Sequence, residues 1–196
     1  MHKALVLALT AAMAGPALAD TAQDGARYFQ KGDYSHALAA WRPLADQGNA
    51  IAQNGLGIMY LNGKGVTQNT SEALRYMSLS AASGSPLGQN NLGGLYRDGK
   101  GVTRDYAKAA QWFSAAAAQG NSAGMYNLGL MYETGQGMKA DLPRSYMWYA
   151  LAADQSDAPN ADAHRDALLH RMSATEQSEA RRLTATCKAS NFRGCR

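Results

Sequence analysis

A short loop with the pattern Gly-x-Gly occurs three times at a fixed distance along the chain. The copies are Gly63-Lys64-Gly65, Gly99-Lys100-Gly101 and Gly135-Gln136-Gly137, and each lies 36 residues after the one before it. Self-similarity with a period of about 20 to 50 residues is typical of solenoids, in which one small unit cannot bury its apolar face alone. The repeat therefore predicts a stack of similar units, an architecture suited to binding.

The register of these loops defines three full units, at residues 48–83, 84–119 and 120–155. Seven positions are identical in all three, and in the first unit they are Gly48, Leu56, Gly57, Tyr60, Gly63, Gly65 and Ala81. The register also extends backwards, because Trp41 lies 36 residues before Met77. Residues 20–47 are therefore predicted to form a helical hairpin that is a shorter copy of the later units.

Each unit carries the start and stop signals of two helices. Side chains that favour helix N-caps precede the first helices at Asn49, Ser85 and Asn121, and the second helices at Asn69, Asp105 and Asp141. A glycine inside each first helix, Gly57 in the first unit, costs roughly 1 kcal/mol relative to alanine. Its recurrence indicates that another helix passes too close for a side chain. The predicted fold is an all-α solenoid of αα-hairpins.

The most specific pattern spans residues 89–113 and reads Gln-Asn-Asn-Leu-Gly-Gly-Leu-Tyr-Arg-Asp-Gly-Lys-Gly-Val-Thr-Arg-Asp-Tyr-Ala-Lys-Ala-Ala-Gln-Trp-Phe. It resembles the Sel-1-like repeat, a relative of the tetratricopeptide repeat with a longer loop between its helices. The resemblance covers residues 48–155. It implies a right-handed superhelix that acts as an adaptor for other proteins, often in exported bacterial proteins or in signalling and quality-control complexes.

The resemblance also implies a binding groove. In the related tetratricopeptide folds, the side of the first helix that faces away from the Leu56–Tyr60 stripe lines a concave groove. The binding residues expected there are Asn54, Asn90, Asn91, Arg97, Tyr126 and Asn127, beside Ile58, Leu61, Gly94, Leu130 and Glu133. Because amides both donate and accept hydrogen bonds, a row of asparagines could hold an extended peptide. The alternative is that these side chains bond the neighbouring helix.

Residues 1–19 have the features of a secretory signal peptide. Lys3 supplies the positive start, residues 4–14 the apolar run, and Ala17-Leu18-Ala19 the cleavage site. The apolar run is shorter than the roughly 20 residues that span a bilayer, and no other stretch is apolar over that length. We therefore expect a periplasmic or secreted protein, cleaved after Ala19, without an integral membrane segment.

The last segment, residues 156–196, departs from the repeat and is expected to cap the solenoid. Asp157 stands in the N-cap register, but His164-Arg165 replaces the Leu-Gly pair. A helix is predicted over residues 161–172, and a capping box formed by Ser173 and Glu176 begins another that runs to about Ala189. Residues 160–196 hold 7 basic and 4 acidic residues, which indicates a solvated surface or a contact with an acidic partner or anionic lipid.

Cys187 and Cys195 are the only cysteines in the chain. In an exported chain, two cysteines eight residues apart favour a structural disulfide, because a redox-active pair usually has the tighter Cys-x-x-Cys spacing. This bond would tie the last residues to the preceding helix.

Motifs for catalysis, metals and cofactors are not found in the sequence. Ser122 lies in a Gly-x-Ser-x-Gly match, but the hydrolase motif needs a strand before the serine, and here a helix is predicted. The histidines His36, His164 and His170 lack the spacing that places two metal ligands on one helix face. The Gly-Lys-Gly loops lack the remaining features of a phosphate-binding loop, and aromatic residues without basic neighbours argue against nucleic acid.

The sequence thus predicts a non-catalytic adaptor that binds a protein or peptide through the groove and needs no cofactor. Two alternatives stay open. One is a hydrolase of the β-lactamase-associated kind found among some relatives, although the Ser-x-x-Lys and Lys-Thr-Gly motifs of dedicated enzymes are missing from this sequence. The other is a binder of cell-wall glycan such as peptidoglycan, with aromatic and asparagine side chains contacting the sugar.

Overall fold

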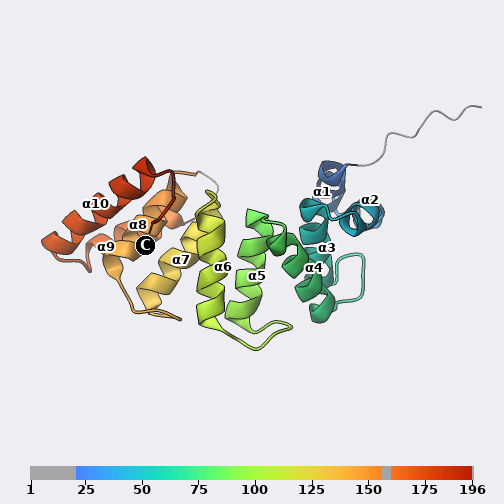
Figure 1. The fold of residues 1–196 in the computed structure, drawn as a ribbon, viewed down its shortest axis with the longest axis horizontal. Helices are drawn as coiled ribbons and strands as arrows, with labels where there is room; N and C mark the ends of the chain where they lie inside the picture. The colour runs from blue at the N-terminus through green and yellow to red at the C-terminus, as the bar shows by residue number, and fades with distance from the viewer. Residues whose placement is uncertain (1–20, 156–159, 196) are drawn as a thin grey trace, which may run out of the picture.

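The computed structural model describes residues 21–155 and 160–195, which form ten α-helices and no strand. These are α1 (Ala22–Gln30), α2 (Tyr34–Asp46), α3 (Ala50–Asn62), α4 (Thr70–Ala82), α5 (Pro86–Asp98), α6 (Tyr106–Ala117), α7 (Ser122–Thr134), α8 (Leu142–Ala153), α9 (Ala161–Leu169) and α10 (Ala174–Ala189). The helices follow one another along the long axis of the molecule, from α1 and α2 at one end to α9 and α10 at the other (Figure 1). The all-α solenoid is confirmed. Within the described ranges, no helix has the length and apolar character needed to cross a membrane.

The helices form two layers. Each first helix packs on its own second helix, in the pairs α3–α4, α5–α6 and α7–α8, and each second helix packs on the next first helix. The first helices also contact one another, α3 with α5 and α5 with α7, whereas α4, α6 and α8 make no comparable mutual contacts in the described structure. The first helices are therefore the more closely spaced, inner layer of the stack.

The helix ends follow the predicted caps. All six predicted N-cap side chains, from Asn49 to Asp141, accept a hydrogen bond from a backbone N–H of the first turn. The first helices end at Gly63, Gly99 and Gly135, whose φ angles are 65°, 68° and 72°. Glycine adopts this left-handed conformation without the steric penalty of other residues, which explains the first glycine of each loop.

The second glycine of each loop lies against the preceding unit. A Cβ on Gly101 would be 2.6 Å from the carbonyl oxygen of Thr70, and one on Gly137 would be 2.6 Å from the carbonyl carbon of Tyr106. Thr70 and Tyr106 are the first residues of α4 and α6. The loop therefore closes its own hairpin and also contacts the previous one.

The glycine inside each first helix lies against a large side chain of the second helix. A Cβ would be 2.7 Å from Met77 at Gly57, 2.8 Å from Phe113 at Gly93 and 2.7 Å from Tyr149 at Gly129. These three partners are buried and belong to the core. The predicted close passage of a second helix is confirmed.

The N-terminal hairpin achieves the same closeness differently. The indole of Trp41 packs directly against Gly25 of α1 and Gly55 of α3, and its N–H donates to the carbonyl of Ala22 at 2.9 Å. One tryptophan thus packs on glycines of two helices and joins α1, α2 and α3, whereas Met77, Phe113 and Tyr149 each pack on the helical glycine of their own hairpin. The start of α1 is fixed by a capping box between Thr21 and Asp24, which the sequence analysis did not identify.

The C-terminal cap differs from the prediction in one helix boundary. The first cap helix, α9, ends at Leu169, not at Met172. The turn that follows buries Met172 among Leu168, Tyr149 and Ala180 and lets Arg171 pair with Glu133 of α7. The capping box of Ser173 and Glu176 is present, and α10 packs on α8. The proposed N-cap at Asp157 and the signal segment lie outside the described residues.

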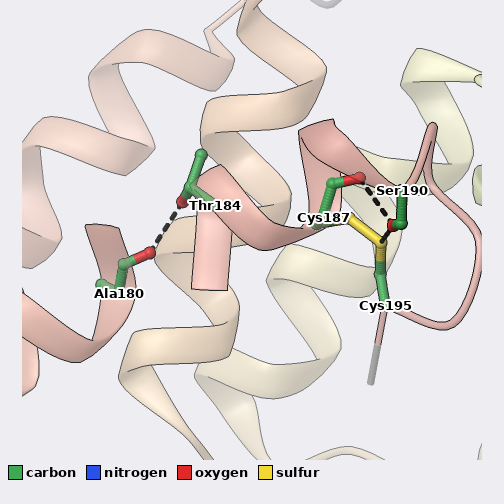
Figure 2. The surroundings of a disulfide bond; sticks show 5 residues. All are labelled: Ala180, Thr184, Cys187, Ser190 and Cys195. Carbon is green, nitrogen blue, oxygen red and sulfur yellow. Dashed lines mark hydrogen bonds between the residues drawn. A yellow bond between two sulfur atoms is a disulfide. The ribbon is translucent and has the colours of Figure 1, made fainter. Parts of the chain in front are cut away.

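The disulfide joins Cys187, near the end of α10, to Cys195, with 5.3 Å between their Cα atoms. In Figure 2 the chain leaves α10, turns at Ser190 and returns so that Cys195 faces the helix, while the Ser190 hydroxyl donates to the carbonyl of Cys187 at 2.9 Å. Cys187 is buried in the core of the third unit, and Phe192 packs against that core. The bond therefore holds the final turn against the solenoid.

The adjacent glycines Gly93 and Gly94 allow a matched test of the close-packing argument. A Cβ on Gly94 would meet no heavy atom within 4 Å, whereas one on Gly93 would clash with Phe113. We expect Gly94→Ala to stabilise the protein by about 0.5–1 kcal/mol through helix propensity. Gly93→Ala should destabilise it by about 1–3 kcal/mol through overpacking. Urea unfolding followed by circular dichroism measures both, and equal shifts would contradict the assignment.

The disulfide should stabilise the C-terminal cap. Closing so short a loop is worth roughly 2–3 kcal/mol on the chain-entropy estimate. We expect Cys195→Ala to lower the thermal midpoint, and wild-type protein in excess reductant to melt at the same temperature as the variant. Reductant should leave the variant unchanged. The bond would be disproved if a thiol assay found two free sulfhydryls in protein that had been expressed into the periplasm and then unfolded.

Candidate functional site

The predicted binding residues lie on the inner layer of the solenoid. Asn54 is on α3, Asn90, Asn91 and Arg97 are on α5, and Tyr126 and Asn127 are on α7. Asn54 is 7% exposed, and the other five side chains are partly buried. The structure brings five of the six into one hydrogen-bonded group and places Tyr126 in a different one.

The asparagines form a ladder across three helices. Nδ2 of Asn91 donates to Oδ1 of Asn54 at 2.8 Å, which joins α5 to α3. Nδ2 of Asn127 donates to Oδ1 of Asn90 at 2.9 Å, which joins α7 to α5. A longer bond of 3.5 Å, from Asn90 to Asn91, connects the two pairs. These asparagines thus bond to neighbouring helices, which the sequence analysis had left open as the alternative to binding a peptide.

The ladder does not use the full hydrogen-bonding capacity of its amides. An asparagine side chain has two N–H donors and an oxygen that accepts two bonds. Each of the three donating nitrogens uses one N–H within the ladder. The second N–H groups and the spare acceptor capacity are what an extended peptide backbone would require.

Arg97 extends the ladder toward the loop of the second unit. Its Nη1 donates to Oδ1 of Asn127 at 2.8 Å, and its Nε donates to Oδ1 of Asp98 at 2.8 Å. The hydrogen bond from Arg97 lowers the pKa of Asp98 below its ordinary value, and the positive charges of Arg97 and Lys100 act in the same direction. Lys100 lies with its Nζ 3.6 Å from the Asp98 carboxylate. Two cations and one anion leave this rim with a net positive charge.

A pocket of about 290 Å³ opens beside the ladder. Its walls are Ile58, Leu61 and Asn62 of α3, Met77 of α4, Asn90, Asn91, Gly94, Leu95, Arg97 and Asp98 of α5, Lys100, and Asn127 of α7. The walls combine aliphatic side chains, amides and the charged rim. Asn62 and Asp98, the last residues of α3 and α5, and Lys100 of the following loop line the pocket but were not among the binding residues expected from the sequence.

Two groove residues of the third unit, Tyr126 and Glu133, are occupied by the C-terminal cap. The hydroxyl of Tyr126 lies 3.0 Å from Nε2 of His164, and the hydroxyl of Tyr149 donates to Glu133 at 3.0 Å. Arg171 pairs with the same carboxylate, and Nδ1 of His164 lies 3.8 Å from it. Burial and the bond to Glu133 raise the pKa of Tyr149, so its hydroxyl stays a donor. His164 and Arg171, where the repeat pattern is lost, close this end.

Ser122 and the titratable groups show little that points to catalysis. Ser122 is the first residue of α7, is 6% exposed and follows a helical turn, not a strand. No group of three or more His, Cys, Asp and Glu side chains in residues 21–155 and 160–195 is arranged to hold a metal ion. The ladder and its pocket are therefore the candidate site that the binding residues expected from the sequence form in the described structure.

Two solved structures are similar to this chain. One is a protective antigen of uropathogenic Escherichia coli strains that displays an SLR fold, with 36% identity, a TM-score of 0.63, and coverage of 69% of this chain and 30% of that chain. This chain thus spans under a third of that protein's length. The other is a Sel1 repeat protein from Oxalobacter formigenes, with 25% identity, a TM-score of 0.65, and coverage of 80% of this chain and 72% of that one. No match is found among curated proteins.

The sequence profile of the Sel1 repeat matches three consecutive segments, residues 50–85, 86–121 and 122–157. Each segment is 36 residues long, as is the period of the glycine loops, and begins at the first residue of α3, α5 or α7. On these matches and its stacked hairpins, the chain belongs to the Sel1 repeat family.

Proposed function

We propose that this protein is a non-catalytic adaptor that binds a protein or peptide segment in the groove lined by α3, α5 and α7. Sel1 repeat proteins commonly mediate protein–protein interactions and are generally non-catalytic scaffolds. The observation that carries the groove assignment is the pocket beside the asparagine ladder, where free amide donors and aliphatic side chains occur together. The amide donors would bind the backbone of an extended peptide, and the aliphatic side chains would contact the peptide's side chains.

The proposed location is the cell envelope or the outside of the cell. The disulfide between Cys187 and Cys195 supports an oxidising compartment, because cytosolic thiols are normally kept reduced. The signal-like features of residues 1–19 point in the same direction.

Glycan binding and hydrolysis have less support than peptide binding. Stacking on a sugar ring requires an accessible aromatic face, but the ring of Tyr126 packs against Tyr149 and His164 at centroid distances of 5.3 and 5.4 Å. We expect the purified protein neither to sediment with isolated peptidoglycan nor to turn over nitrocefin. Sedimentation with peptidoglycan would favour the glycan alternative, and nitrocefin turnover the hydrolase.

Site-specific photo-crosslinking tests the groove directly. A benzoylphenylalanine at Asn62, on the rim of the pocket, should form an adduct with the partner in the periplasm. The same residue at Leu79, exposed on α4 and outside the pocket, is the matched control and should not form that adduct. If adducts to the same protein form from both positions, or from Leu79 alone, the groove is not the binding surface.

Charge introduced into the ladder should abolish binding. In Asn91→Glu/Asn127→Glu, two carboxylates replace amide donors, so we expect at least a tenfold loss of affinity for the crosslinked partner and a loss of about 1 kcal/mol of stability from each broken bond. The control is Gln111→Glu, the same type of change on the exposed surface of α6. Titration with purified partner measures the affinity, and unchanged binding by the double variant would exclude the ladder.

A further inference from the structure

Gly94 is a glycine in the middle of a helix with no packing reason to be there. The glycines at Gly57, Gly93 and Gly129 make room for side chains of the second helices, but a Cβ on Gly94 would meet no atom within 4 Å. A helical glycine lowers helix stability relative to alanine, and here no close contact offsets that loss. The absence of a side chain at this position therefore calls for another explanation.

The repeat shows what is missing at Gly94. The equivalent positions in the first and third units are Ile58 and Leu130, one repeat before and one repeat after. Gly94 and Ile58 both line the pocket of about 290 Å³. The gap above Gly94 thus interrupts a row of branched aliphatic side chains along the inner layer, and a side chain of the same size from another molecule would complete the row.

The size of the pocket limits its occupant. Sites for drug-sized molecules and cofactors are about 300–1,000 Å³. A volume of about 290 Å³ lies at the lower limit, which suits one side chain with its adjoining backbone. Aliphatic walls come from Ile58, Leu61 and the buried Leu95, so the side chain that enters should be aliphatic.

The rim of the pocket selects the neighbouring residue by charge. Arg97 and Lys100 together carry two positive charges against the single negative charge of Asp98. Arg97 has five N–H groups, of which three make hydrogen bonds within the described structure, to Asp98 and Asn127. The remaining N–H groups and the ammonium of Lys100 favour a carboxylate beside the aliphatic side chain.

We propose that the pocket at Gly94 is a specificity pocket that receives one Leu, Ile or Met side chain of an extended partner segment, with an acidic residue next to it at Arg97 and Lys100. This inference rests on the groove function proposed above and adds the chemistry of the segment. The spare amide groups of Asn90 and Asn91 hold the backbone on either side of the inserted side chain.

The test is selection from random octapeptides displayed on phage, followed by titration of synthetic peptides that carry the selected sequence. We expect an aliphatic residue adjacent to Asp or Glu in the selected peptides. Gly94→Leu fills the pocket with the side chain of its equivalent Leu130 and should lower affinity at least tenfold. Because nothing lies within 4 Å of the Gly94 Cβ position, the variant should stay folded, which its melting temperature verifies.

Two lysine substitutions, one at the pocket and one away from it, test the preference for an acidic residue. Lys100→Glu should lower the affinity for the selected acidic peptide by about three- to tenfold. Lys64→Glu changes the equivalent lysine of the first loop, which does not line the pocket, and should leave binding unchanged. Equal effects of the two substitutions would contradict the proposal that the acidic residue of the peptide lies beside Lys100.

Failure of this inference can be distinguished from failure of the groove function. Selected peptides without the aliphatic–acidic pair, no selection at all, or binding unchanged by Gly94→Leu would each overturn the specificity pocket. The crosslink from Asn62 tests the groove independently of these peptides. If the crosslink forms but the peptide results are negative, the adaptor function is supported and the specificity pocket is excluded.

Discussion

The close approach of two helices within each hairpin is the constraint on which the solenoid depends. Gly57, Gly93 and Gly129 carry no side chain. Met77, Phe113 and Tyr149 of the second helices therefore reach the backbones of the first helices and are buried there. Because interiors are packed at the density of organic crystals, a single added methyl group at these positions forces the facing side chain, or the helix that carries it, to shift. The helix pair thus behaves as a fixed unit, and stacking such units buries the remaining apolar faces.

The glycine loops transmit this geometry from one unit to the next. The first glycine ends the inner helix in a left-handed conformation, and the second lies against the start of the previous outer helix, at Thr70 for Gly101 and at Tyr106 for Gly137. The residue between them varies, Lys64, Lys100 and Gln136, because its side chain is not needed for either contact. Variation at this residue is therefore free to serve binding, as we propose for Lys100.

The features that sequence analysis predicted are those that recur within every hairpin. The helix caps at Asn49 and Asp105 depend on local backbone conformation and recur as the same class of side chain. The close-packing glycines depend on a contact with the second helix of the same hairpin and recur as identity. The asparagine ladder depends on how side chains of adjacent helices meet, so sequence indicated its members and not their pairing. The end of α9 at Leu169 was mispredicted because Met172 and Arg171 find partners in the third unit, and such tertiary contacts leave no local pattern.

In each first helix, the positions that face the second helix and the positions that face the groove are thus under different constraints. A position that faces the second helix must repeat, because the packing geometry repeats. A position that faces the groove is free to differ, as Ile58, Gly94 and Leu130 do in one register. If all three were alike, an extended segment could bind in several registers displaced by one unit. A single gap would remove that degeneracy: in the complex that we propose, the aliphatic side chain enters at Gly94, which holds the segment in one position along the groove with its acidic neighbour directed to Arg97 and Lys100.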